Sequence, residues 1–215
     1  MPPRPPYITI AALLTITGCS QSTPSASQGD PSAIPSPVAA ELAATGEPLP
    51  AGRYTRSGFV PAITIELDGS WQAVQLANGF FDVQQDPGSS DVIAVQFGRP
   101  SGIFGESGLS DPATADAAVE VLRTNAGLQV VESSDSRIGG LDGAQVTVEN
   151  AGQSHVSVMQ VPPGALGIDP GRRLWIALFD TPDGLLAIMV GGSTARWDEA
   201  LAAAEPVLES VRIGP

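Results

Sequence analysis

The sequence has one cysteine, one histidine and no lysine among its 215 residues. A single cysteine excludes an internal disulfide, so the fold must be held together by its hydrophobic core. One histidine and one cysteine are also too few for a structural zinc site, which uses nitrogen and sulfur ligands. We therefore expect no zinc and no cofactor in this protein.

Positive charge is scarce as well. Ten arginines stand against 23 acidic residues, and the formal net charge is −13 at pH 7. An acidic surface repels the phosphates of nucleic acids and anionic headgroups, so we expect no binding of nucleic acid. The adjacent Arg172 and Arg173 are isolated and form no basic patch. Arginine without lysine, with abundant Ala, Gly and Pro, favours a high-GC, actinobacterial origin.

A long hydrophobic run is the third absence. The N-terminal apolar segment, residues 7–17, is far shorter than the roughly 20 residues of a membrane-spanning helix. It follows a short segment that contains Arg4 and leads to Cys19. This arrangement indicates a signal peptide over residues 1–18.

Residues 16–19, Ile-Thr-Gly-Cys, resemble the lipobox of bacterial lipoproteins. The resemblance implies that the Cys19 thiol receives a diacylglyceryl group and that cleavage makes Cys19 the first mature residue. Two acyl chains anchor a protein stably, whereas one chain gives only marginal attachment. We expect a lipoprotein on the extracytoplasmic face of the cell membrane; a secretory signal that happens to contain a cysteine is the alternative.

Two regions are expected after the signal. Residues 19–50 begin with a tract rich in Ser, Pro, Gln and Ala, which buries too little apolar surface to offset the entropy of ordering. We predict a disordered linker there. Residues 51–215 are then expected to form a single domain, long enough to bury roughly 70% of the surface of its unfolded chain.

Apolar periodicity predicts the strands of this domain. Alternation over residues 63–67 indicates a half-buried strand, and strands are also expected at 80–83 and 92–97. Residues 98–108 are rich in glycine and are expected to form a surface loop.

Later strands are expected to form two hairpins. Residues 144–149 should pair with 156–161. The almost continuous apolar runs 174–179 and 185–190 flank turn-forming residues, which predicts a central antiparallel pair buried on both faces. A short final strand is expected at residues 211–213.

Two helices are expected. The first should start with Asp111 as the N-cap and Pro112 as the first helical residue, and end near Gly127. Its apolar face repeats at helical spacing: Ala115, Val119, Leu122 and Ala126. The second should cover residues 195–209, with Pro206 kinking or interrupting it. Its core face is expected to include Trp197, Leu201, Ala204 and Leu208.

This order of elements predicts an α+β fold, an antiparallel β-sheet with two main helices packed on it. Two packing patterns resemble the PsbP-like fold and the mycobacterial LpqN-type lipoproteins of that fold. They are the closing segment 197–212 and the series Phe59, Pro61, Ile63, Ile65, Leu67 and Trp71. The resemblance covers the whole domain and implies an adaptor or binding module without known catalysis.

No catalytic site is predicted. His155 is expected to be exposed at the start of a strand, although a Ser-His-Asp arrangement is arithmetically open. Residues 105–109 miss the nucleophile elbow because Leu109 replaces a required glycine. A calcium site is conceivable at two pairs of turn aspartates: Asp180 with Asp183, and Asp86 with Asp91. Three tryptophans are expected in the core: Trp71, Trp175 and Trp197.

These observations predict a non-enzymatic, membrane-anchored module that binds an envelope protein or a small ligand. The first alternative is a carrier of apolar ligands or lipids, which would need an internal cavity. The second is a hydrolase that uses His155.

Overall fold

The computed structural model describes residues 38–162 and 164–214, and within them the chain forms 15 strands and two α-helices in three sheets. Sheet A has the order β1 (Ala40–Glu41), β2 (Gly52–Arg56), β3 (Ile63–Leu67) and β15 (Arg212–Ile213). Sheet B has the order β4 (Gln72–Ala77), β5 (Phe80–Gln85), β6 (Ile93–Gly98), β14 (Gly184–Ser193), β13 (Arg172–Thr181), β10 (Leu141–Asn150) and β9 (Leu128–Ile138). Sheet C has the order β12 (Gly164–Ile168), β11 (Val156–Val161), β7 (Gly102–Gly105) and β8 (Gly108–Ser110).

The two helices are α1 (Ala115–Arg123) and α2 (Trp197–Ser210), the second preceded by the 3-10 turn η1 (Thr194–Arg196). Strand pairs in all three sheets are antiparallel, apart from the parallel pair of β1 and β2. The fold is therefore mostly β, with antiparallel sheets and two helices, which agrees in outline with the predicted class.

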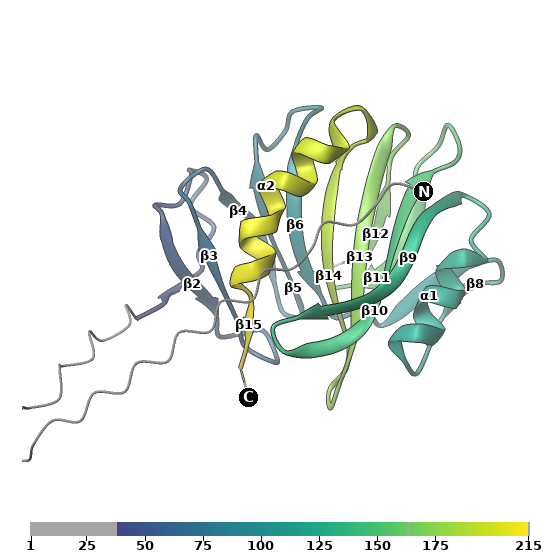
Figure 1. Ribbon diagram of the computed structural model, residues 1–215, viewed down its shortest axis with the longest axis horizontal. Helices are drawn as coiled ribbons and strands as arrows, with labels where there is room; N and C mark the ends of the chain where they lie inside the picture. Colours follow the sequence, from purple (N-terminus) through teal and green to yellow (C-terminus); the bar gives the residue numbers. More distant parts are fainter. Residues whose placement is uncertain (1–37, 163, 215) are drawn as a thin grey trace, which may run out of the picture. The chain divides into compact units, whose positions relative to one another are not determined.

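Sheet B is the central layer, because hydrophobic clusters lie against both of its faces. One cluster joins sheet B to sheet A and α2, and the other joins it to sheet C and α1 (Figure 1). Side chains of β13 alternate between the two: Trp175, Ala177 and Phe179 enter the first, and Leu174, Ile176 and Leu178 enter the second. β14 pairs with β13 along its whole length, so the predicted central pair is confirmed.

Several other predicted elements are also confirmed. The strand at residues 63–67 is β3, and its side chains alternate between buried and less buried positions. β5 and β6 lie at the expected places, and the closing strand is β15, paired with β3. The tryptophans are buried as expected: Trp71, Trp175 and Trp197.

The glycine-rich segment 98–108 is not a loop. It contains β7 and the first residue of β8, which pair as a hairpin at the edge of sheet C. Ile103 is fully buried there, and an added Cβ at Gly102 or Gly105 would lie within 3 Å of neighbouring side chains. The sequence pattern predicted a flexible loop here. In the structure, glycine instead allows neighbouring side chains to pack closely against the main chain at these positions.

The predicted hairpin between residues 144–149 and 156–161 is wrong. β10 pairs with β9 and β13 in sheet B, whereas β11 pairs with β12 and β7 in sheet C. The hairpin partner of β10 is β9, joined through Gly139 and Gly140, both with positive φ. A two-residue Gly-Gly turn between apolar residues is a hairpin signal that favours this pairing.

Helix α1 starts later than expected. Its N-cap is Thr114, whose hydroxyl accepts a hydrogen bond from the Ala117 amide at 3.2 Å, so Asp111 is not the cap. The helix ends at Arg123, with Thr124 as the C-cap, so Ala126 is exposed and Gly127 does not cap it. The buried face consists of Ala115, Ala118, Val119 and Leu122.

Helix α2 continues through Pro206 to Ser210 without an interruption. Pro206 lies on the exposed side, where water can reach the Ala202 carbonyl that loses its amide partner. Its buried face is Trp197, Ala200, Ala204 and Val207. Leu201 and Leu208, which were expected in the core, are only partly buried against it.

Candidate binding site

His155 lies just before β11 and is exposed, as predicted. Its Nδ1 is 2.9 Å from Oδ1 of Asp169, and the two side chains are 53% and 73% exposed. Within residues 38–162 and 164–214, no serine hydroxyl hydrogen-bonds to the imidazole. The arrangement is a solvated surface pair and lacks the nucleophile that a triad requires.

Two of the four aspartates considered for calcium, Asp180 and Asp91, have structural contacts. Asp180 Oδ1 accepts a hydrogen bond from the amide of Ala115 at 2.8 Å, which satisfies a free donor at the start of α1. Asp91 Oδ2 lies 3.4 Å from Nη1 of Arg196. Among the described residues, no cluster of three or more potential metal ligands occurs.

Two further positions from the sequence analysis are the rejected nucleophile elbow at residues 105–109 and Cys19, the predicted site of lipid modification. Ser107 lies in the turn between β7 and β8, so it is part of a hairpin and not of a strand-turn-helix elbow. Cys19 lies outside the residues that the structure describes. No helix in residues 38–162 or 164–214 is long and apolar enough to cross a bilayer.

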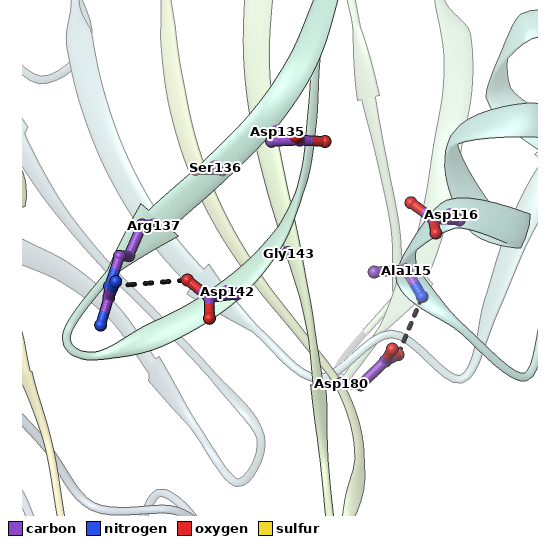
Figure 2. Close-up of a pocket in the computed structure, with 8 residues that line it drawn as sticks. All are labelled: Ala115, Asp116, Asp135, Ser136, Arg137, Asp142, Gly143 and Asp180. Atoms are coloured by element: carbon purple, nitrogen blue, oxygen red, sulfur yellow. Dashed lines mark hydrogen bonds and ion pairs between the residues drawn. The ribbon is translucent and has the colours of Figure 1, made fainter.

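A hollow of about 510 Å³ lies between the start of α1 and the β9–β10 hairpin (Figure 2). Its charged lining comprises Asp116, Asp135, Asp142, Asp180 and Arg137. Nε of Arg137 lies 3.5 Å from Oδ1 of Asp142, and these side chains are 74% and 82% exposed. Such exposed pairs contribute little to stability or binding, so this hollow is a solvated acidic surface.

A groove beside β12 has a more structured wall. Two hollows of about 550 and 150 Å³ lie on either side of Leu166, which lines both. Gly167 and Ile168 continue the lining of the larger hollow, and Gly164 and Ala165 that of the smaller. Since these five residues are the whole of β12, we call the two hollows together the β12 groove.

The floor of the larger hollow is one row of residues across sheet B. Ala94 on β6 pairs with Gly191 on β14, which pairs with Leu174 on β13. Ala94 and Gly191 are small, and the nearest atom to an added Cβ at Gly191 would be Leu174 Cδ1, at 3.6 Å. The missing side-chain volume in this row makes the hollow.

Arg172 forms one end of the larger hollow. Its guanidinium donates hydrogen bonds to the carbonyls of Ser90 and Val92, at 3.0 and 2.9 Å. Burial lowers the pKa of this guanidinium, while nearby Asp169 and Asp91 act in the opposite direction. These bonds attach the segment before β6 to the central sheet, so the end wall of the groove is held in place.

A buried carboxylate neighbours one lining residue of each hollow, Gln96 of the larger and Gln75 of the smaller. Asp82 on β5 is 2% exposed, and it pairs in register with Gln96, which lines the larger hollow. Its Oδ1 accepts a hydrogen bond from the amide of Gln75 at 2.6 Å, and its Oδ2 accepts one from Nε2 of Gln84 at 2.6 Å.

Burial raises the pKa of the Asp82 carboxyl, and the hydrogen bonds from Gln84 and Gln75 act in the opposite direction. No ion pair involving Asp82 occurs among the described residues. Beneath the groove there is therefore a buried acid that is held by amide hydrogen bonds and has no ion-pair partner in the described part of the chain.

Sequence reasoning missed this cluster. The available signal was Asp82 within the apolar strand Phe-Phe-Asp-Val, because an acid inside a buried strand needs hydrogen-bond donors. Its partners could not be found in the same way, since Gln75, Gln84 and Gln96 come from three different strands.

No protein-family model matches this chain, and no curated relative matches it. Several solved structures are similar to this chain. LpqN of Mycobacterium tuberculosis, described as involved in cell envelope biogenesis, is 10% identical with a TM-score of 0.40, and the match covers 77% of this chain and 86% of LpqN. The cyanobacterial PsbP of Synechocystis is 14% identical with a TM-score of 0.42, over 80% of this chain and 98% of that one.

A protein of Bacteroides thetaiotaomicron is 12% identical with a TM-score of 0.35, over 71% of this chain and 45% of that one. LpqN and PsbP are the two kinds of protein that the sequence patterns resemble. The architecture given above is established by this chain's own strand pairing.

Proposed function

We propose that this protein is a non-enzymatic binding module, anchored to the extracytoplasmic face of the membrane through Cys19, that holds its ligand in the β12 groove. The observation that carries the proposal is the groove itself. It combines a floor of small residues, a fixed arginine at one end and a buried acid with its amides beneath. Pre-formed hollows with a few converging polar groups are typical ligand sites.

The groove and the first described strand lie on different faces of sheet B. The strand β1 belongs to sheet A, in the layer on one face of sheet B. The groove lies on the opposite face, beside sheet C.

The carrier alternative needs an internal apolar cavity. The clusters on both faces of sheet B are filled by large, fully buried side chains, including Trp71, Phe97, Phe179 and Met189. The hollows beside β12 are open and carry charged and amide groups. These features favour a ligand with polar groups at the surface over a lipid enclosed in the core.

The hydrolase alternative depends on His155, whose surroundings give it little support. Both members of the His155–Asp169 pair are largely exposed. If a hydrolytic activity toward simple esters is measured, the His155→Ala variant should retain it. Loss of the activity in that variant alone would favour the hydrolase.

The anchor is tested by labelling cells with an alkyne fatty acid. The wild-type chain should take up the label and fractionate with membranes, whereas Cys19→Ala should do neither. Label that persists in Cys19→Ala, or an unmodified wild-type N-terminus by mass spectrometry, would disprove the anchor and leave the groove untested.

The groove is tested by photo-crosslinking in living cells. A benzoylphenylalanine at Ser90, at the groove, should give a discrete adduct, and one at Val131, 45% exposed on β9, should not. Gly191→Leu should fill the hollow and remove the adduct. Gly52→Leu in sheet A, where an added Cβ also meets only an ordinary contact, should leave it unchanged. The proposal is contradicted if the adduct is equally strong with the probe at Ser90, with the probe at Val131, and in the Gly191→Leu and Gly52→Leu variants.

A further inference from the structure

We propose that the occupant of the β12 groove is an extended, basic segment of a partner protein. It adds as a strand to the outer edge of β12 and places a lysine or arginine over the amides that surround Asp82. This inference rests on the proposed function, because it names the ligand class of the same groove.

The first step is the free edge of β12. β12 is the end strand of sheet C, and in the described part of the chain its strand partner is β11 alone. The carbonyl of Gln160 on β11 accepts a hydrogen bond from the amide of Ser101 at 2.9 Å, so the main chain of Gln160 faces β7. In an antiparallel pair, its partner Ala165 then directs its N–H and C=O to the outer side.

The second step is the space beside that edge. The hollows lie along all five residues of β12, from Gly164 to Ile168. Strands in a sheet lie about 4.8 Å apart and stacked sheets about 10 Å apart, so an added strand would extend sheet C over the neighbouring strands of sheet B. The side chains that it would meet there include Gln75, Phe80 and Gln96.

The third step is the chemistry of this floor. Gln75 lines the smaller hollow and Gln96 the larger one, and each glutamine side chain has a carbonyl oxygen that can accept a hydrogen bond. Gln96 is the register partner of Asp82 in sheet B, so this acceptor lies in the same row as the buried carboxylate. Acceptors above a buried carboxylate that has no ion-pair partner in the described part of the chain favour an incoming donor with positive charge.

The fourth step is the charge at the far end. Arg172 and Arg173 both line the larger hollow and would repel a second basic side chain, but Arg173 is paired with Glu149 and Arg172 is not beside Asp82. Asp82 and Gln96 belong to a row of paired residues that reaches β13 at Ile176. Ile176 and Arg172 are four residues apart on β13, a distance of about 13 Å along the strand. A single basic residue near the β5 side of the groove avoids this repulsion, and the acidic net charge of the chain adds attraction.

The test uses the full 15N-labelled chain in detergent and three blocked ten-residue peptides. Each peptide alternates Val and Thr, and one central Thr is replaced by Lys, Gln or Glu. We expect the Lys peptide to shift the amide resonances of β12, to slow hydrogen exchange at Ala165, and to bind about tenfold more tightly than the Glu peptide.

Two variants separate the edge from the floor. Asp82→Asn should keep peptide binding but reduce the Lys-to-Glu preference to about threefold or less. Ala165→Pro removes the outward N–H and should abolish binding of all three peptides. If Ala165→Pro does not fold, Asp82→Asn and the three peptides still decide the question.

The proposal is overturned if the Lys and Glu peptides bind equally, if the shifts occur at β9 and not at β12, or if no peptide binds at millimolar concentration. An adduct at Ser90 in cells together with any of these results would retain the groove as a binding site and reject strand addition. Loss of the Ser90 adduct would reject the groove itself.

Discussion

Asp82 and Gln84, both on β5, are joined by a hydrogen bond in which Nε2 of Gln84 donates to Oδ2 of Asp82 at 2.6 Å, and Gln96 on β6 is the register partner of Asp82. The same carboxylate accepts from the main-chain amide of Gln75, at the irregular part of β4 between Ala73 and Leu76. One buried acid thus supports the edge strand β4 and orients the amides beside the groove.

This acid predicts an unusual dependence of stability on pH. Burial raises the pKa of Asp82, so the native state binds its proton more tightly than the unfolded chain does. The contribution of this residue to the free energy of unfolding therefore increases as pH falls from neutral, through the raised native pKa, toward about 3.9, the pKa of an unfolded aspartate. A tenfold difference in proton affinity corresponds to about 1.4 kcal/mol.

Urea unfolding of the wild type and of Asp82→Asn at pH 7 and pH 5 measures this effect. The free energy of unfolding of the wild type minus that of the variant should be larger at pH 5. Val131→Ala, at an exposed position on β9, removes no titratable group; it is the control and should give the same difference at both pH values. If the free energy of unfolding of the wild type minus that of Asp82→Asn is smaller at pH 5 than at pH 7, the raised pKa of Asp82 is contradicted.

Gly143 on β10 should not tolerate a side chain. An added Cβ would lie 2.1 Å from the carbonyl oxygen of Leu178 and 2.7 Å from Phe179 on the neighbouring strand. Because this obstacle is main chain, Gly143→Ala should lower the free energy of unfolding by about 2 kcal/mol or more. Gly164→Ala, with nothing within 4 Å of the added Cβ, should change it by about 0.5 kcal/mol or less. If thermal unfolding shows the same loss of stability for Gly143→Ala and Gly164→Ala, the predicted clash at Gly143 is wrong.

Arg173 connects α2 to the central sheet and should not be replaceable by lysine. It donates through Nε and Nη2 to Oε1 of Glu149, its register partner on β10, and its Cζ lies 5.4 Å from the ring centroid of Trp197. Lysine lacks the planar fork, so Arg173→Lys should cost about 1–2 kcal/mol of unfolding free energy and alter Trp197 fluorescence.

The matched control is Arg53→Lys. Arg53 also forms a cross-strand pair with a glutamate, Glu66, but in sheet A and with side chains 37% and 55% exposed. Exposed pairs contribute little, so this variant should lose about 0.5 kcal/mol or less. If both lysine variants lose the same amount, the contact with Trp197 adds nothing.

Elements with strong local periodicity were predictable. β3, β5 and β6 follow from local alternation and turn residues, and β13 with β14 follows from two apolar runs around a short turn. The position of α1 was less predictable, because the cap is chosen by contacts: Thr114 caps the helix while Asp180, 65 residues away, accepts from its first amide.

The sequence by itself determined the apolar content of each strand, the burial of the tryptophans and the exposure of the lone histidine, because these depend on side-chain chemistry and local spacing. Only the tertiary structure decided that β10 pairs with β9, that β11 belongs to another sheet, and that a groove follows β12. The groove exists because Asp82, Gln96, Leu166 and Gly191 lie on four strands whose order in space differs from their order in the chain. Pairing between distant strands is set by the energy of the whole core, and no local pattern encodes it.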